Sequence, residues 1–229
     1  MTSFPPKLKM WLIEALIEQG VTSAKAQKLC LSYDRSFAIY PKRFYEEAER
    51  LRKRKTIKYC FIGTLMVDSE TQRNREWIIE FAKKKMDMDS YLQITDTVAR
   101  NSHKPLGKFD HTLTRHGLVP KELPLDQRNQ FDTHYFKTMT ASKFCLCPAG
   151  DAHWSMRFYE ALMCKCIPIV KDKIDTYRSK EQAQLAYKFY TNNEEHIYRD
   201  DWADENYKLF LERHTFDYGV PHALKEAKQ

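Results

Sequence analysis

Three successive segments indicate the fold of this chain: Phe144-Cys-Leu-Cys-Pro-Ala-Gly-Asp151, Ser155-Met-Arg-Phe-Tyr-Glu-Ala-Leu162 and Cys166-Ile-Pro-Ile-Val170. A short apolar segment ends at a turn with Pro and Gly, helix formers follow a serine, and a second apolar segment closes the unit. This order predicts a strand, a turn, a helix and a strand, with both strands buried in a parallel sheet. The helix would begin at the carboxyl edge of the sheet, where open α/β sheets bind anions and nucleotides.

Two charged residues of this helix, Arg157 and Glu160, are three positions apart and therefore share a face. A guanidinium can pair with two oxygens of a diphosphate, and a carboxylate can accept hydrogen bonds from ribose hydroxyls. The alternative role for Arg157 is a salt bridge to Glu160, and the alternative for Glu160 is an ordinary surface glutamate. As a residue on a helix face at a cleft, Glu160 is expected to pack little. Ser155 would cap the helix or donate to a phosphate, and both roles place it at the helix start.

These motifs resemble the signature of the exostosin-like glycosyltransferases: a Cys-Pro-Arg-Gly-Asp turn, then Ser-x-Arg, Glu-Ala and Gly-Cys-Ile-Pro-Val. Here Ala149 replaces the turn arginine, and Lys165 stands where the family has a glycine. A weaker match is Lys58-Tyr-Cys-Phe-Ile-Gly63-Thr64 with Arg73-Asn-Arg75 after it. The resemblance covers roughly residues 57–170. It implies a GT-B type architecture, a nucleotide-sugar donor and sugar transfer, usually with inversion and without a bound metal.

We therefore expect an α/β protein with a Rossmann-like parallel sheet resembling the donor half of a GT-B glycosyltransferase, and an N-terminal helical segment. Residues 1–55 are predicted to form that segment, a candidate acceptor-side element. Residues 56–229 are predicted to form the nucleotide-sugar-binding domain with closing C-terminal helices. A chain of 229 residues suits one large domain, and two full Rossmann-like domains would fit only tightly. A non-catalytic nucleotide-sugar or glycan-binding module therefore stays open as the alternative to an enzyme.

The remaining elements follow from periodicity and from Gly and Pro positions. Residues 99–129 carry several Gly and Pro residues and are expected to be mostly irregular. Strands are expected over 57–62 and 90–95, and helices over 41–55, 73–85, 132–142, 180–190 and 201–214.

Further donor contacts are expected on both sides of the sheet's carboxyl edge. Asp151 and His153 precede the signature helix, where either could touch a base or a sugar hydroxyl, or form an ordinary turn. Gly63-Thr64 ends the first confident strand. Arg73 and Arg75 flank the start of the next helix, so they form either a diphosphate clamp beside that strand end or an ordinary surface turn.

Inverting sugar transfer needs one group that takes the proton of the acceptor hydroxyl. The candidates are Asp34, Asp96, Asp110 and His111. Asp96 follows a strand end, as residues at a switch point do, and Asp34 could reach in from the N-terminal segment. Arg157 would stabilise the leaving diphosphate. The sequence does not choose among the candidate bases.

The net charge of +7 and the pI near 9.0 indicate an anionic partner. The densest basic run is Arg50-Leu-Arg-Lys-Arg-Lys55. It is typical of a solvated helix end, and no stacking-aromatic motif accompanies it, so nucleic acid is not an expected partner. The expected partners are a nucleotide-sugar donor, with UDP-sugar as the substrate, and an oligosaccharide or glycoprotein glycan acceptor.

Cys145-x-Cys147 and Cys164-x-Cys166 could be drawn as four zinc ligands, but one-residue spacing in apolar strands favours buried thiols. No metal or resident cofactor is expected. Asp87-Met-Asp89 matches the metal-binding Asp-x-Asp of the other major glycosyltransferase fold only in letters. Without a signal peptide or an apolar run of about 20 residues, we expect no membrane span and reduced thiols. Together with the resemblance to the exostosin-like enzymes, this suggests a cytoplasmic or virus-encoded enzyme acting in a host cytoplasm.

Overall fold

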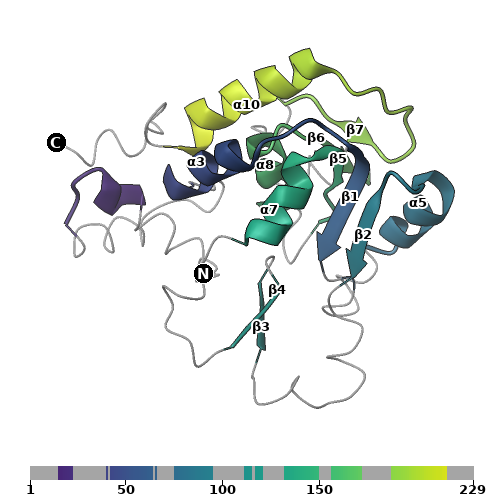
Figure 1. Ribbon diagram of the computed structural model, residues 1–229, viewed down its shortest axis with the longest axis horizontal. Coiled ribbons are helices and arrows are strands. Elements are labelled where there is room, and N and C mark those ends of the chain that lie inside the picture. Colours follow the sequence, from purple (N-terminus) through teal and green to yellow (C-terminus); the bar gives the residue numbers. More distant parts are fainter. Residues whose placement is uncertain are drawn as a thin grey trace, which may run out of the picture.

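The computed structural model describes residues 15–22, 40, 42–63, 65, 75–94, 111–114, 117–120, 132–149, 156–171 and 187–215. Strands and helices alternate along most of these ranges (Figure 1). In chain order they are α3 (Lys42–Leu51), β1 (Ile57–Gly63), α5 (Trp77–Lys85), β2 (Tyr91–Ile94), β3 (His111–Thr114), β4 (Gly117–Pro120), α7 (Thr133–Thr140), β5 (Ser142–Leu146), α8 (Met156–Met163), β6 (Ile167–Val170), β7 (Tyr190–Thr191) and α10 (Asp200–His214).

Five of the strands form one sheet in the order β2-β1-β5-β6-β7, and every neighbouring pair in it is parallel. In the register of β1 and β5, Tyr59 lies opposite Phe144 and Cys60 lies opposite Cys145. The chain moves outward from β1 to β2, and β5 then pairs with the other side of β1. The strand order therefore reverses between β1 and β5. This parallel α/β sheet confirms the expected fold class.

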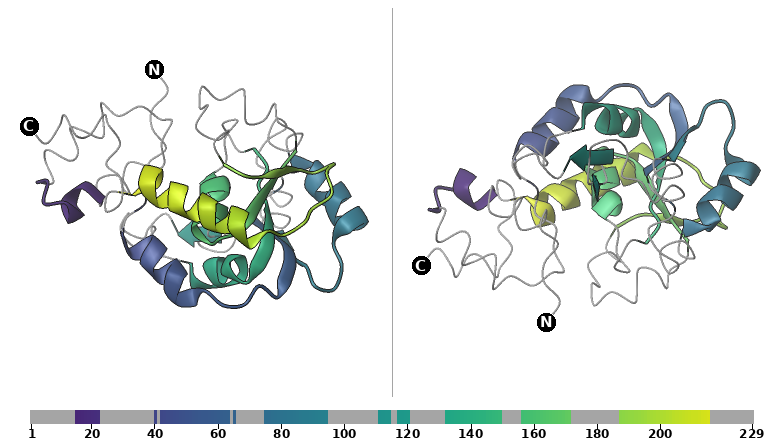
Figure 2. Two further views of the ribbon diagram at one scale, coloured as in Figure 1. Left: turned by 90° about the horizontal axis from the view of Figure 1, so that it is seen from above. Right: turned by 90° about the horizontal axis from the view of Figure 1, so that it is seen from below.

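The two faces of the sheet are covered by different helices, which explains why its strands are apolar on both sides. Tyr59, Phe61 and Phe144 belong to a cluster with residues of α5. Cys60 and Cys145, which directly follow Tyr59 and Phe144 and so face the other side of the sheet, belong to a second cluster with residues of α3, α7, α8 and α10. Figure 1 shows α5 on one side of β1 and β2, with α3, α7 and α8 on the other. In both views of Figure 2, α10 runs across this second group.

Helix α8 lies inside this second group, and every residue from Arg157 to Met163 is buried. Helix α8 ends at Met163, and in the turn that follows it Lys165 has a left-handed φ of 54°. The amide of Cys166 donates to the carbonyl of Ala161 across this turn. This conformation favours glycine because a side chain costs roughly 1 kcal/mol there. It explains why a glycine is usual in the family motif at the position of Lys165.

Several expected elements have different bounds or a different structure. The helix expected over 41–55 ends at Leu51, because the basic run that follows offers no apolar residue to bury. Within residues 99–129, which are expected to be mostly irregular, the described residues form the antiparallel pair β3 and β4. The prediction of a helix over 180–190 is wrong at its C-terminal end, because Tyr190 lies in β7 and pairs with Ile169 of β6. Here tertiary pairing overrides local propensity. Residues 172–186 lie outside the described part.

The predicted N-terminal helical segment is described in two pieces, a short helix over 15–18 and α3. Phe44 and Ala48 of α3 are buried in the same cluster as Phe136 of α7 and Phe210 of α10. This part of the segment therefore packs onto the sheet-bearing domain, while the division at residue 55 stays a prediction. Among the described helices, none has the length and apolar character needed to cross a bilayer.

Candidate functional site

The reversal of strand order places a candidate site at the carboxyl ends of β1 and β5. In open α/β sheets ligands bind outside the strand ends at such a switch point, because the two crossover connections leave in opposite directions there. Here β1 ends at Gly63 and β5 at Leu146, and residues 147–149 continue from β5. Helix α8, which follows β5, carries the two charged residues of the sequence motif.

Arg157 in the first turn of α8 reaches across to the end of β1. Its Nη2 donates to the carbonyl oxygen of Ile62 at 2.8 Å, and its guanidinium lies 4.7 Å from the centre of the Phe61 ring. The side chain is 6% exposed. Two segments 95 positions apart are thus joined at the switch point.

Gly63 is required by this arrangement. A Cβ atom added at position 63 would lie 2.3 Å from Nη2 of Arg157 and 3.3 Å from its Cζ. Because real Cβ atoms do not approach other atoms so closely, any other residue here would displace the guanidinium. The glycine that the sequence placed at a strand end therefore makes room for Arg157.

The guanidinium of Arg157 remains charged in spite of its burial. Burial lowers the pKa of Arg157, but Tyr135, Cys145, Cys147 and Glu160 raise it, and on balance the pKa lies above its ordinary value. Its Nε atom is buried and has no hydrogen-bond partner in the described part of the chain. A buried cation with an unused donor is costly unless an acceptor approaches it, so the geometry suits an anionic ligand.

Glu160, one turn further along α8, points to a different neighbour. The hydroxyl of Tyr135 in α7 donates to Oε2 of Glu160 at 2.8 Å. Glu160 is 0% exposed, so the expectation that this residue packs little is wrong. The Tyr135 hydroxyl holds this enclosed carboxylate in one orientation, which would fix the acceptor oxygens that a ribose needs.

Arg75, which lies just before α5, reaches the turn that follows β5. Its Nε donates to the carbonyl oxygen of Ala149 at 3.1 Å. Ala149 occupies the position where the family motif has an arginine. A guanidinium from another part of the chain is therefore present beside the turn that lacks its own.

The described residues thus bring together four of the predicted site residues, Gly63, Arg75, Arg157 and Glu160, around the ends of β1 and β5. The other predicted residues lie outside the described residues: Asp34, Thr64, Arg73, Asp96, Asp110, Asp151, His153 and Ser155. Of His111 the structure describes the backbone in β3. The catalytic base therefore stays a prediction.

Tyr135 is not among the site residues predicted from the sequence, although it lies in the helix directly before the signature strand. A tyrosine among apolar helix positions was the available signal, because a buried hydroxyl needs a hydrogen-bond partner. The contacts of Arg157 with the Ile62 carbonyl and the Phe61 ring could not be predicted. Every strand has main-chain acceptors and many have core aromatics, so nothing in the sequence distinguishes these two.

Five cysteines are described, and all are free thiols buried beside the sheet. Sγ of Cys166, for example, donates to the carbonyl oxygens of Met139 at 2.8 Å and Ser142 at 3.2 Å. No group of three or more His, Cys, Asp or Glu side chains in the described ranges could hold a metal ion. Asp87 of the Asp-Met-Asp sequence lies before β2, and a hydrogen bond from the Ser90 hydroxyl lowers the pKa of its carboxyl group.

The comparisons with known proteins agree with this geometry. Residues 19–202 match the Exostosin GT47 domain, which is most of the chain. A probable beta-1,4-xylosyltransferase of Arabidopsis thaliana is 43% identical over 51 residues, 22% of this chain and 12% of that protein. A probable glucuronosyltransferase of Oryza sativa subsp. japonica has the same identity and coverage, and another is 50% identical over 36 residues, 16% of this chain and 9% of that protein. The chain thus matches about a tenth of the length of these relatives, and through the domain match it belongs to the exostosin GT47 family of glycosyltransferases.

Proposed function

We propose that this protein transfers a sugar, with inversion, from a UDP-sugar to a hydroxyl group of a glycan acceptor. The observation that carries the proposal is Arg157, a buried and charged guanidinium at the switch point whose Nε has no hydrogen-bond partner in the described residues. A diphosphate supplies negative oxygens in the geometry that a guanidinium fits best. Family membership supports the same reaction class.

In this reaction the acceptor oxygen attacks the anomeric carbon, the bond from that carbon to the phosphate oxygen breaks, and UDP leaves with the bonding electrons. A base takes the acceptor proton, and Asp96 and Asp34 are the proposed candidates. Arg157 would bind the diphosphate more strongly as its negative charge grows in the transition state. Glu160, held by Tyr135, would accept from the ribose hydroxyls and orient the nucleotide.

We further propose that Arg75 takes the part of the arginine that the motif lacks at Ala149. Its Nε lies 3.1 Å from the Ala149 carbonyl, so its guanidinium is anchored at the turn. From there it would provide a second positive charge for the leaving diphosphate. Gly63-Thr64, Arg73, Asp151, His153 and Ser155 complete the proposed donor site.

A donor panel tests this function. Release of UDP or GDP is measured with UDP-xylose, UDP-glucuronate, other UDP-sugars and GDP-sugars, with and without xylo-oligosaccharide acceptors. The first two donors are chosen because the relatives are named as xylosyl- and glucuronosyltransferases. Slow donor hydrolysis, stimulated by an acceptor, is expected. Saturable donor binding without turnover under any acceptor would instead support the non-catalytic binding module.

The proposed reaction needs no divalent metal, since arginines neutralise the leaving group. Activity should persist after dialysis against EDTA. Loss of activity in EDTA and its recovery with Mn²⁺ would reject this part of the proposal and favour metal-assisted departure of the diphosphate. We place the reaction in a reducing compartment such as the cytoplasm, which the free thiols among the described residues support.

A further inference from the structure

A groove of about 630 Å³ lies at the opposite edge of the sheet, where the strands begin. Residues 52–55 precede β1, Lys143 is the second residue of β5, and Lys165 precedes β6. At about 3.3 Å per residue, the five residues of β5 separate this edge from the donor site by roughly 15 Å. The groove is therefore a site separate from the proposed donor site. In the described part of the chain, its cationic lining residues are Arg52, Lys53, Arg54, Lys55, Lys143 and Lys165.

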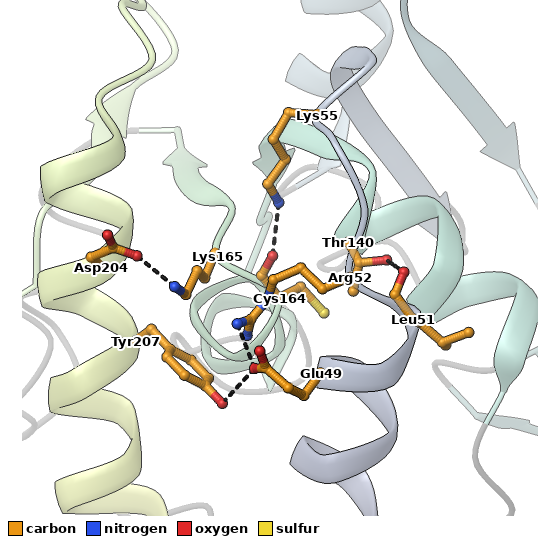
Figure 3. Close-up of polar contacts among 9 residues, drawn as sticks. All are labelled: Glu49, Leu51, Arg52, Lys55, Thr140, Cys164, Lys165, Asp204 and Tyr207. Atoms are coloured by element: carbon orange, nitrogen blue, oxygen red, sulfur yellow. Dashed lines mark hydrogen bonds and ion pairs between the residues drawn. The ribbon is translucent and has the colours of Figure 1, made fainter.

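Three of these cations have structural roles (Figure 3). Nζ of Lys55 donates to the carbonyl oxygen of Cys164 at 2.8 Å, at the C-terminal end of α8, where the helix dipole favours positive charge. Lys165 pairs with Asp204 of α10. Arg52 pairs with Glu49, and its guanidinium lies 4.5 Å from the centre of the Tyr207 ring. These contacts join the groove floor to α3, α8 and α10.

The other three cations, Lys53, Arg54 and Lys143, make no ion pair or side-chain hydrogen bond within the described part of the chain. Lys53 and Arg54 are exposed, and Lys143 is half-buried. Like charges gathered around one concave surface repel each other, and a narrow groove strengthens their field. Their grouping is explained if an anionic ligand occupies the groove.

We propose that this groove binds an acidic polysaccharide, a chain of sugars that carry carboxylate or sulfate groups. The groove also contains Asp200 and Asp204, whose oxygens can accept hydrogen bonds from sugar hydroxyls, and the half-buried ring of Tyr198. A ligand with both anionic groups and hydroxyl donors matches this mixture of charges. Its action as an anchor for the acceptor glycan rests on the proposed function, whereas the binding itself does not.

The same features disfavour two other polyanions. A nucleic acid has at most one free hydroxyl per nucleotide to donate to Asp200 and Asp204, and the described lining of the groove offers one aromatic ring rather than a stacking platform. An anionic membrane is flat, whereas these cations line a concavity, so lipid headgroups would reach few of them.

The test compares two triple variants of equal charge. Lys53→Gln, Arg54→Gln and Lys143→Gln are combined in one, and Lys83→Gln, Lys84→Gln and Lys208→Gln, which lie on α5 and α10, in the control. Affinity for a fluorescent oligoglucuronate of eight sugars is measured at several salt concentrations. The wild type and the control should bind it in a salt-dependent manner, and the groove variant at least about tenfold more weakly. A neutral xylo-oligosaccharide of equal length should not compete.

Equal loss in both triple variants would overturn the proposal, because it would show attraction by net charge alone. Tighter binding of a single-stranded oligonucleotide, or of vesicles with phosphatidylserine, would overturn it in favour of those partners. Donor hydrolysis is measured in parallel to separate this proposal from the proposed function. Groove-dependent oligoglucuronate binding supports the groove even where no donor is hydrolysed, and normal hydrolysis without such binding rejects the groove alone.

Discussion

At the scale of single residues, Arg157 and Glu160 combine full burial with charge. Neither is placed by hydrophobicity, and each is held by a polar partner: the Ile62 carbonyl for Arg157 and the Tyr135 hydroxyl for Glu160. Buried charges are retained in proteins where a partner or a ligand compensates their desolvation. Two substitutions separate the contribution to function from the contribution to stability.

The first is Arg157→Lys, which keeps the charge but loses the planar fork. If Arg157 stabilises the departing diphosphate, kcat should fall at least about tenfold while the donor KM changes less. Steady-state kinetics measure both constants, and thermal unfolding shows whether the variant is folded. Arg199→Lys, an exposed residue paired with Asp201, is the control and should be silent. A near wild-type rate for Arg157→Lys would leave Arg75 and Arg73 as the remaining candidates.

The second is Tyr135→Phe, which removes the donor to Glu160. A buried carboxylate that loses a hydrogen bond costs about 1–3 kcal/mol, so the melting temperature should fall by several degrees. Nucleotide affinity should fall as well if Glu160 must be oriented for ribose. Tyr91→Phe removes a hydroxyl that bonds Gln93 and His134 near the surface and should change little. Equal stability of the two variants would contradict a supporting role for Tyr135.

At the scale of elements, the sheet depends on side chains that complete its edges. β7 has two residues and is held by β6 on one side. The chain just before it is fixed by Asn206 of α10, which is buried and bonds both main-chain groups of Lys188. Oδ1 accepts from the amide at 2.8 Å, and Nδ2 donates to the carbonyl at 2.7 Å. The side-chain amide of Asn206 thus satisfies the main-chain N–H and C=O of Lys188, as a neighbouring strand would.

We predict that Asn206→Ala destabilises the protein by about 1–3 kcal/mol, because both main-chain groups of Lys188 lose their partner. Urea unfolding measures the change. Hydrogen exchange should also become faster over residues 187–191, next to the lost contacts. Glu205→Ala, an exposed neighbour on the same helix, should stay within about 0.5 kcal/mol of wild type. Unchanged exchange in Asn206→Ala would show that β6 alone holds β7.

At the scale of the whole molecule, the buried thiols link stability to pH. Burial raises the pKa of Cys145, Cys164 and Cys166 well above the ordinary value. The folded protein therefore keeps these protons when the unfolded chain, with thiol pKa values near 8.5, has begun to lose them. Stability is fully present below about pH 8.5 and declines as pH rises above it.

Urea unfolding under reducing conditions at pH 7.5, 8.5 and 9.5 measures this decline, which should approach about 1.4 kcal/mol per pH unit for each thiol involved. Cys164→Ala removes one of the three thiols and should make the decline shallower. Wild-type stability that stays constant from pH 7.5 to 9.5 would show that these thiols already ionise in the folded protein, as metal-bound cysteines do.

The layered α/β architecture and the place of the site within it could be predicted from the amino-acid pattern. The predicted strands 57–62, 144–147 and 166–170 and the helix-forming residues between them depend on neighbours a few positions away, so their pattern is visible in the sequence. The same pattern placed Arg157 and Glu160 at the start of α8 and Gly63 at a strand end. It also placed the family motif, whose match the domain comparison confirms.

The groups that these residues contact could not be predicted, because they come from distant parts of the chain. Arg157 bonds a carbonyl 95 positions away, Glu160 accepts from a tyrosine 25 positions away, and Arg75 reaches a turn 74 positions away. β7 is a strand because it pairs with the edge of β6. The groove cations lie close together because β1, β5 and β6 begin side by side. Such contacts depend on packing between distant segments, and no local periodicity encodes them.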